Sequence, residues 1–388
     1  MKKKIAILGS TGSIGKSLLK IIKKNKKENF QIILLTANKN YKGLLKQTKI
    51  FKVKNVIIND KLSFEKFKSI NKNKDLNIYN NFNELDKIFK SKLDYTMNSI
   101  VGLEGLEPTL QIIKYTKAIA IANKESIICG WNLINKKLIA NNTKFIPVDS
   151  EHFSIWYAIQ NINKSNIDKV FLTASGGPLL NLNKKKIQKV SVKEALKHPT
   201  WKMGKKISID SSTLMNKVFE VIEAKNIFNL NLDKISILIH PKSYIHALIS
   251  FKDGMIKIIA HETTMDIPIL NSLFYERNPN YQNKDIKLKL LNNLNLSKVD
   301  TNRFPIISIL KKIPQKISLY ETVIVSANDQ LVRLYLNNEI KYNDISDKLL
   351  KFLNLKEFIK LKKVTPSKLS DIINLDKYVR LKIKSKSV

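Results

Sequence analysis

The chain has 388 residues, enough for two to three domains at about 150 residues each. Hydrophobic residues make up 43% of it, which excludes a disordered chain. Its 69 Lys and Arg against 32 Asp and Glu give a net charge of +37, a balance typical of proteins that bind nucleic acid or anionic membranes. Only four of the basic residues are arginine, the residue that nucleic-acid readers use most. A chain rich in Lys, Asn and Ile with so few Arg is typical of an A+T-rich coding sequence. We therefore attribute the charge to codon composition and expect no specific nucleic-acid partner.

Cysteine content and hydropathy point to the cytoplasm. Cys129 is the only cysteine, which excludes an internal disulfide and fits a reducing compartment. No apolar run approaches the roughly 20 residues that span a bilayer. The first apolar run ends at Gly9, too early for a signal peptide. We expect a soluble cytoplasmic protein without a membrane partner.

Residues 1–149 alternate short apolar runs with helix-period segments. Strands are predicted at residues 4–8, 31–36, 55–58, 95–100, 118–122 and 144–148, and helices at 13–22 and 108–115 among others. Because these strands are apolar on both faces and alternate with helices, they predict a parallel, doubly wound sheet. The N-terminal domain is therefore expected to be α/β and Rossmann-like.

Residues 150–275 show a mixed pattern that predicts an α+β catalytic domain. The expected elements are strands at 170–173, 235–239, 247–251 and 255–260, and one long helix at 211–227. Asp253 and Gly254 between two apolar runs indicate a hairpin.

The rest of the chain is predicted to be a connector and a helical domain. Residues 276–300 are polar, rich in Asn and Lys, and without a clear period, which suits a linker. Amphipathic helices are expected at 304–312, 319–336, 349–361 and 366–373, forming a C-terminal helical bundle at 301–388.

The first predicted strand leads into a loop with glycine at positions 9, 12 and 15. Glycines there permit a tight turn and bring backbone N–H groups close to a pyrophosphate at a helix N-terminus. The spacing is G-x-x-G-x-x-G rather than G-x-G-x-x-G, so a glycine-rich turn without a ligand is the alternative.

The second predicted strand ends at Asn38, Lys39 and Asn40. An NAD site would usually place an acid here for the ribose 2′-hydroxyl, and none is present. Lys39 can instead meet a 2′-phosphate, which favours NADP, unless it is simply a solvated lysine.

Asn123, Lys124 and Glu125 directly follow another predicted strand. Open α/β sheets bind ligands at the carboxyl ends of their strands, so these residues are candidate site residues. The alternative is an asparagine helix cap followed by a first-turn glutamate.

Three acids are candidate ligands for a divalent metal. Asp149 and Glu151 project to the same side of an extended segment, where like charges favour a cation between them. Glu220 shares a predicted helix face with Asn216 and Lys217. Oxygen ligands suit Mg²⁺ or Mn²⁺, but exposed loop acids and a surface Lys217–Glu220 ion pair are the alternatives.

Two further segments carry candidate substrate residues. Ser175 begins a Ser-Gly-Gly-Pro loop whose hydroxyl and N–H groups can cradle a phosphate. Residues 195–205 contain His198, Trp201 and Gly204 and are a candidate lid. A surface loop with a structural histidine is the alternative for this segment.

Together these motifs resemble the 1-deoxy-D-xylulose 5-phosphate reductoisomerase family. The matching stretches are GSTGSIG (9–15), IVG and GLEPT (100–109), ANKES (122–126), PVDSEH (147–152), SGGP (175–178), HPTWKMG (198–204), KISIDSSTLMNK (206–217) with Glu220 and Glu223, and IHPKSYIH (239–246). The resemblance implies a homodimer that uses NADPH and Mg²⁺ or Mn²⁺, with Co²⁺ as a further candidate. It implies conversion of a small phosphorylated sugar to 2-C-methyl-D-erythritol 4-phosphate.

The resemblance also implies roles for individual residues. Cofactor contacts fall to Thr11, Gly12, Ser13, Ile14, Asn38, Lys39, Asn40, Asn123, Glu125 and Gly204. Metal ligands are Asp149, Glu151 and Glu220, which with Lys124 form the catalytic set. Substrate contacts fall to Lys124, Ser150, Glu151, Ser175, His198, Trp201, Ser211, Asn216, Lys217 and Glu220.

The chain departs from the family pattern at a few positions. Asn38 replaces a usual glycine, Lys202 lies in the lid, residues 262–268 differ from P-D-M-R-x-P-I, and 326–330 only partly keep A-A-N-E. Two alternative functions are another NADP-dependent reductase, such as an aldehyde or semialdehyde dehydrogenase, and a basic nucleic-acid-binding protein. The first lacks a nucleophile motif around Cys129, and the second rests on charge alone.

Overall fold

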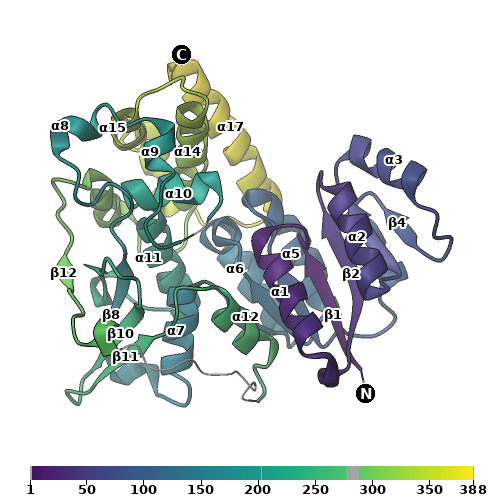
Figure 1. The fold of residues 1–388 in the computed structure, drawn as a ribbon. Helices are drawn as coiled ribbons and strands as arrows, with labels where there is room; N and C mark the ends of the chain where they lie inside the picture. Colours follow the sequence, from purple (N-terminus) through teal and green to yellow (C-terminus); the bar gives the residue numbers. More distant parts are fainter. Residues whose placement is uncertain (1, 202, 278, 280–287, 388) are drawn as a thin grey trace. The chain divides into compact units, whose positions relative to one another are not determined.

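The computed structural model describes residues 2–201, 203–277, 279 and 288–387 (Figure 1). The chain divides into two compact units. The first comprises Met1–Ser126, Ile134–Asp149 and Met265–Tyr281, and the second comprises Ile127–Leu133, Ser150–Thr264 and Gln282–Val388. Each unit contains one β-sheet.

The first unit is built on a seven-stranded parallel sheet. Its strands are β1 (Lys3–Leu8), β2 (Phe30–Ala37), β3 (Asn55–Ile58), β4 (Asn77–Tyr79), β5 (Tyr95–Asn98), β6 (Ala118–Ile121) and β7 (Lys144–Pro147). The order β4-β3-β2-β1-β5-β6-β7 confirms the predicted doubly wound sheet. The short edge strand β4, half-buried and without an apolar run, was not predicted.

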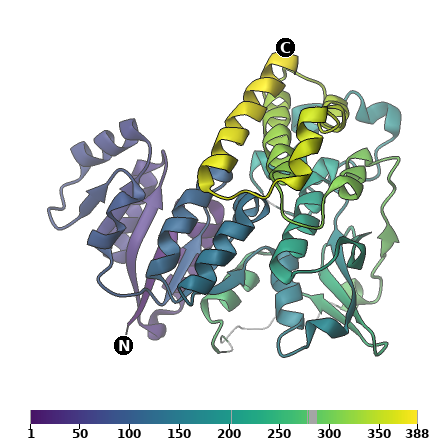
Figure 2. The same cartoon turned by 180° about the vertical axis from the view of Figure 1, so that it is seen from behind.

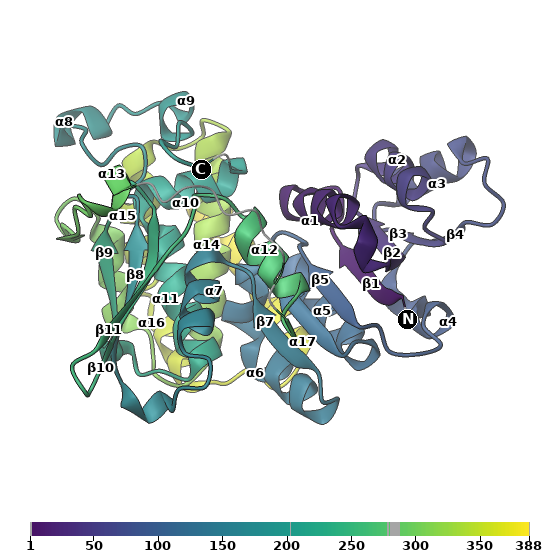
Figure 3. The same ribbon diagram turned by 60° about the horizontal axis from the view of Figure 1, so that its bottom comes forward.

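In the described part of the chain, six α-helices connect the parallel strands: α1 (Ser13–Lys24), α2 (Tyr41–Phe51), α3 (Lys61–Ile70), α4 (Leu85–Ile88), α5 (Leu106–Ile112) and α6 (Lys124–Ala140). Helix α12 (Asp266–Leu273) joins this unit from later in the chain, and all seven are labelled in Figure 3. The strand order reverses between β1 and β5, so right-handed crossovers place α1 and α2 on one face and α5 on the other. A reversal of this kind leaves a crevice at the carboxyl ends of β1 and β5, where open α/β sheets bind ligands.

The second unit contains a five-stranded mixed sheet. Its strands are β8 (Ile167–Ala174), β9 (Ile235–Ile239), β10 (Ile245–Phe251), β11 (Ile256–Ala260) and β12 (Ser297–Lys298), in the order β11-β10-β8-β9-β12. The predicted hairpin is confirmed: β10 and β11 pair antiparallel, and Gly254 has φ +86°. β12 adds to the sheet from within the segment predicted to be a plain linker.

Helices cover this sheet and form the C-terminal part of the unit (Figure 2). They are α7 (Ser150–Ala158), α8 (Lys184–Ile187), α9 (Val192–Ala195), α10 (Lys205–Thr213), α11 (Met215–Phe228), α13 (Leu288–Leu291), the 3₁₀ helix Pro305–Lys312, α14 (Leu319–Leu336), α15 (Tyr342–Phe352), α16 (Lys356–Ile359) and α17 (Leu369–Ser387). Ile155 from α7, Val170 from β8 and Val221 from α11 belong to one buried cluster. Helices α7 and α11 are therefore fixed to the sheet through its core.

Two predicted helices are wrong in their extent. The helix expected at 211–227 is two helices, α10 and α11, because Leu214 adopts a left-handed conformation with φ +64°. The apolar periodicity continues on both sides of Leu214, so the break leaves no signal in the sequence. The helix expected at 349–361 is likewise divided between α15 and α16.

No helix among the described residues is long and apolar enough to cross a lipid bilayer.

Candidate active site

The loop after β1 has the tight backbone that close approach to a phosphate requires. Gly9 has φ +77°, and a Cβ there would lie 2.8 Å from the carbonyl oxygen of Ser99. A Cβ on Gly15 would lie 2.6 Å from the Cα of Ser10, so both positions need glycine. Helix α1 starts after Gly12 without a side-chain cap, which leaves its first N–H groups to bind an anion. The predicted pyrophosphate contacts, Thr11, Gly12, Ser13 and Ile14, all lie in this loop and first turn.

Asn38, Lys39 and Asn40 follow β2 and are all exposed. The Asn40 side chain accepts a hydrogen bond from the Gly43 N–H at 3.0 Å and so caps α2. Asn38 is not among the described non-glycine residues with positive φ. It therefore takes the place of the usual glycine without backbone strain. The exposed Lys39 is available to a 2′-phosphate at this strand end.

Asn123 ties the end of β6 to the loop after β5. Its side chain is buried, and its carbonyl oxygen accepts from the Ser126 N–H at 2.6 Å, which caps α6. Its amide nitrogen donates to the carbonyl oxygens of Ile100 and Gly102. Asn123 is therefore a helix cap, which was the alternative to a role in the site. Lys124 and Glu125 lie in the first turn of the helix that it caps, α6. Contacts of Asn123 and Glu125 with a nicotinamide stay a prediction.

Lys124 and Asp149, two predicted site residues, form an ion pair. Their strands β6 and β7 are neighbours, so the residues that follow them meet at one edge of the sheet. Asp149 stands directly before α7, which begins at Ser150.

Three carboxylates gather at the start of α7 and on α11. Asp149, Glu151 and Glu220 each place an oxygen within 4.8 Å of the others. Because Asp149 is joined to α7 through Ser150, the chain itself keeps it beside Glu151. Three carboxylate oxygens form a donor set that Mg²⁺ and Mn²⁺ prefer, so these residues fit the predicted metal site.

Lys217 lies between two of these acids. Its ammonium is 2.8 Å from Glu151 Oε1 and donates to Glu220 Oε2. Burial alone would lower the pKa of Lys217, but the two carboxylates raise it above its ordinary value. Burial alone would raise the pKa of Glu151, but the charge of the Lys217 ammonium and its hydrogen bond hold that pKa below its ordinary range. Both shifts favour the charged forms, so Lys217 and Glu151 stabilise each other as an ion pair.

His152 and Glu223 support the acids, although the sequence assigned neither a role. His152 Nε2 is 2.8 Å from the carbonyl oxygen of Glu220, and its Nδ1 is 3.8 Å from Glu223 Oε2. Asp149, His152 and Glu223 form a second group whose ligand atoms lie within 4.8 Å of one another. The position of Glu223, one turn after Glu220 on the same helix face, was the signal that could have identified it.

Ser175, His198 and Ser211 come together as a polar cluster. His198 Nε2 is 3.1 Å from the hydroxyl oxygens of both serines. The His198 Nδ1 accepts from the Trp201 N–H at 2.9 Å, so the ring proton sits on Nε2. Burial lowers the pKa of His198 to about 4, which keeps the ring neutral near pH 7. Gly177 lets the loop approach α10, because a Cβ there would lie 2.6 Å from the Ser211 carbonyl oxygen.

The break at Leu214 separates this cluster from the acids. Asn216 donates to Glu220 Oε1 at 2.5 Å, while Ser211 faces His198. Among the described residues, no hydrogen bond joins Asn216 or Lys217 to the cluster of Ser175, His198 and Ser211. The contacts of Asn216 and Lys217 with a phosphate therefore stay a prediction.

Trp201 borders the site beside two stacked histidines. The His246 ring stacks on that of His261 with centroids 3.7 Å apart, and Trp201 meets His246 edge-on at 6.2 Å. Burial lowers the pKa of His246 to about 3, so its ring is neutral. His246 and His261 were not predicted as site residues. Gly204 is the N-cap of α10, and a Cβ added there would meet no heavy atom within 4 Å.

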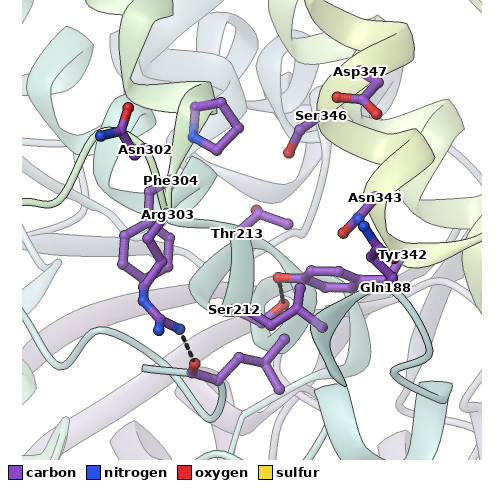
Figure 4. Close-up of a pocket in the computed structure, with 13 residues that line it drawn as sticks. Gln188, Ser212, Thr213, Asn302, Arg303, Phe304, Tyr342, Asn343, Ser346 and Asp347 are labelled. Carbon is purple, nitrogen blue, oxygen red and sulfur yellow. Dashed lines mark hydrogen bonds between the residues drawn. The ribbon is translucent and has the colours of Figure 1, made fainter. Parts of the chain in front are cut away.

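A separate cavity of about 210 Å³ lies between the end of α10, the residues before the 3₁₀ helix Pro305–Lys312, and α15 (Figure 4). Ser212 and Thr213 line one side, and Tyr342 and Ser346 of α15 line another. Two of the lining residues are joined, because the Tyr342 hydroxyl donates to the Ser212 hydroxyl at 3.1 Å. The cavity contains none of the predicted site residues.

Comparisons with known proteins match the whole length of the chain. A family model described as 1-deoxy-D-xylulose 5-phosphate reductoisomerase matches residues 5–130. Two models of C-terminal domains of the same enzyme match residues 145–228 and 261–382. The curated reductoisomerase of Pelagibacter ubique is 58% identical over 388 residues, covering 100% of both chains. That of Wolbachia pipientis wMel is 38% identical over 96% of this chain and 95% of its own.

Solved structures agree with these matches. The reductoisomerase of Zymomonas mobilis in complex with NADPH superposes with a TM-score of 0.87 at 29% identity, covering 100% of this chain and 99% of that one. A reductoisomerase bound to NADPH, fosmidomycin and magnesium gives a TM-score of 0.91 at 30% identity, covering 99% and 98%.

A glycine-rich loop on a doubly wound sheet and a cluster of three carboxylates are typical of a nicotinamide-dependent oxidoreductase with a divalent-metal site. The chain belongs to the 1-deoxy-D-xylulose 5-phosphate reductoisomerase family. It is accordingly an NADPH- and metal-dependent enzyme that isomerises and reduces 1-deoxy-D-xylulose 5-phosphate to 2-C-methyl-D-erythritol 4-phosphate.

Proposed function

We propose that the chemistry of this reaction takes place at the acids around Lys217, with Asp149, Glu151 and Glu220 as metal ligands. The observation that carries the assignment is the convergence of three carboxylate oxygens within 4.8 Å. A divalent ion bound there supplies Lewis acidity, which polarises the substrate ketone and lowers the pKa of the neighbouring hydroxyl.

The residues around the acids orient the substrate. The Ser150 hydroxyl donates to Glu151 Oε2 at 2.5 Å, and the Lys124 ammonium pairs with Asp149. Two hydrogen-bond donors, this hydroxyl and this ammonium, therefore lie beside the acids. These donors can hold the substrate carbonyl and hydroxyls while the carbon skeleton rearranges, either by cleavage and rejoining of a carbon–carbon bond or by a direct shift. The resulting aldehyde is then reduced.

Ser175 and Ser211, joined through His198, are proposed to bind the substrate phosphate, with Asn216 and Lys217 as further contacts. A neutral His198 that donates from Nε2 offers a hydrogen bond without adding charge. Trp201 closes over the substrate from the lid. Binding energy from the phosphate, remote from the reacting carbons, can drive this closure.

The cofactor site is assigned to the loop at 9–15, to Asn38, Lys39 and Asn40, to Asn123 and Glu125, and to Gly204. When bound there, NADPH supplies the hydride. The uncapped start of α1 supports the pyrophosphate contact, and the exposed Lys39 supports the choice of NADPH over NADH.

We also infer the organisation and location of the protein. We divide the chain into a cofactor domain at 1–149, a catalytic domain at 150–275 with its lid, a linker at 276–300 and a helical domain at 301–388. The exposed edge strand β11, with Ile256 and Ile258 largely uncovered, supports a homodimer in which a second copy covers this edge. The single buried thiol of Cys129 supports a reducing cytoplasm.

The test is a spectrophotometric assay of NADPH oxidation. We expect turnover only when 1-deoxy-D-xylulose 5-phosphate and Mg²⁺ or Mn²⁺ are both present, and much slower turnover with NADH. Undiminished turnover in excess chelator would contradict the metal assignment.

A further inference from the structure

Helix α10, which carries Ser211, is held by the C-terminal helix α14 through a buried carboxylate. Asn328 of α14 is fully buried, and its side-chain amide donates to Asp210 Oδ1 at 2.8 Å. The other oxygen of Asp210 is 3.1 Å from the Lys206 ammonium. Both oxygens of this 2% exposed side chain are thus engaged, which fixes the rotation of α10 about its axis.

The same contacts continue into α17. The Lys206 ammonium is 2.9 Å from Asp329 Oδ1, and Arg380 Nη2 is 3.1 Å from Asp329 Oδ2. Arg380 Nε in turn lies 2.7 Å from Asp376 Oδ1. A line of alternating charges therefore joins α10 to two long C-terminal helices, although no residue of this line belongs to the site described above.

The neighbour of Asp210 on α10 is Ser211, which contacts His198. Consecutive helix residues point about 100° apart, so a carboxylate held on the α14 side sets where the next side chain points. A small rotation of α10 would lengthen the 3.1 Å contact between Ser211 Oγ and His198 Nε2. Fixing Asp210 therefore fixes one of the proposed phosphate ligands.

We propose that Asp210 and Asn328 are positioning residues that hold Ser211 in place for the substrate phosphate. The inference rests on the proposed role of Ser211 in phosphate binding. It gives the C-terminal helices a function in substrate affinity, through α10, in addition to their packing.

A purely structural role predicts something different, and α14 offers a matched control. Tyr335 also lies on α14, is buried, and donates a hydrogen bond to the Val190 carbonyl oxygen at 3.3 Å, away from α10. Removing its hydroxyl in Tyr335→Phe costs one buried hydrogen bond but leaves Asp210 untouched. Tyr342→Phe removes the separate contact of α15 with Ser212, drawn in Figure 4.

The experiment compares Asn328→Ala with Tyr335→Phe in the full-length enzyme with Mg²⁺. For Asn328→Ala we expect the KM for 1-deoxy-D-xylulose 5-phosphate to rise about tenfold. A displaced Ser211 would lose its hydrogen bond to the charged phosphate, and tenfold is the loss typical of one such bond. The KM for NADPH should not change, because Ser211 is not among the proposed cofactor contacts. Inorganic phosphate, used as a competitive inhibitor, should weaken by the same factor, about tenfold.

Tyr335→Phe should lower the melting temperature without changing the substrate KM or the phosphate inhibition constant. The exchanged pair Asp210→Asn with Asn328→Asp restores a hydrogen bond between the two positions. This double variant should recover most of the phosphate affinity. If Asn328→Ala does not fold, the phosphate inhibition constant of the double variant tests the proposal in its place.

The proposal is overturned if Asn328→Ala, or the unexchanged Asn328→Asp, alters stability but leaves the phosphate inhibition constant as in the wild type. Ser211→Ala tests the phosphate site itself, independently of the proposed role of Asp210 and Asn328. If Ser211→Ala also leaves that constant unchanged, the phosphate site itself is misassigned. A wild-type enzyme without turnover would instead contradict the proposed function.

Discussion

Replacing Glu220 with Gln removes one negative charge from the proposed metal site with almost no change in shape. Glu220 is 1% exposed, and its two oxygens accept from Asn216 and Lys217. The new amide group must point an NH₂ at one of these two donors, so one hydrogen bond is lost as well as the charge.

Lys217 stays in place after this change, which limits the damage to stability. Its ammonium is still 2.8 Å from Glu151 Oε1, an attraction of about 6 kcal/mol at an effective dielectric of 20, before desolvation is counted. We therefore expect Glu220→Gln to cost about 1–3 kcal/mol of unfolding free energy, the range for one buried hydrogen-bond partner. The full 3–5 kcal/mol for breaking a buried ion pair should not appear.

Catalysis should suffer far more. Loss of one electrostatic contact to the reacting centre typically lowers kcat by about 10²–10³. The assay is kcat as a function of Mg²⁺ concentration, with NADPH binding followed by fluorescence, and NADPH binding should persist. Glu321→Gln is the matched control, because Glu321 is an equally buried acid paired with Lys225 at 2.8 Å and lies outside the site. Near-normal kcat in Glu220→Gln at every Mg²⁺ concentration would refute the assignment of this carboxylate.

Further outcomes follow from the same structure. Lys39→Ala should raise the KM for NADPH and leave that for NADH unchanged; equal effects on both would contradict a 2′-phosphate contact. Gly15→Ala should abolish NADPH binding and lower the melting temperature, because its Cβ would lie 2.6 Å from the Cα of Ser10. The pKa of His198 is about 4 in the folded protein against 6.5 when unfolded. Because the unfolded chain therefore binds a proton first, the free energy of unfolding should fall as pH falls from 6.5 towards 4. Denaturant titrations of His198→Asn should show a flatter dependence in that range. Gel-shift assays at physiological salt should show no specific nucleic-acid complex, and a sub-micromolar, sequence-dependent site would contradict this.

Most of the fold was predictable because strand and helix periodicity survive in the sequence. The alternation before residue 149 predicted six of the seven parallel strands, and the Asp253–Gly254 signal predicted the β10–β11 hairpin. The break at Leu214 was not predictable, since a left-handed leucine carries no local signal and is imposed by tertiary contacts. β12 was missed for a similar reason: two exposed residues become a strand only by pairing with β9.

The candidate site was predictable where strand ends or helix faces bring residues together. Lys124 meets Asp149 because β6 and β7 are neighbours, and Lys217 meets Glu220 because they lie one turn apart. The contact of Lys217 with Glu151 joins two helices and needed the tertiary structure. His246 and His261 were missed because a ring stack between β10 and the residue after β11 has no sequence spacing of its own.

The charge of the site, rather than the +37 of the chain, explains why the acids matter more than the surrounding lysines. Asp149, Glu151 and Glu220 contribute three negative charges and the neighbouring Glu223 a fourth, while Lys124 and Lys217 contribute two positive ones, which leaves two negative charges. A divalent cation would balance these charges, so that an oxyanion developing on the substrate would face no net negative charge from the site. Removing either lysine would leave the acids three units negative, tightening metal binding but placing a net negative charge beside that oxyanion. Lys217→Met should therefore bind Mn²⁺ at least as tightly as the wild type, by equilibrium titration, yet turn over at least about tenfold more slowly. Weaker Mn²⁺ binding in this variant would show that Lys217 builds the metal site rather than balancing its charge.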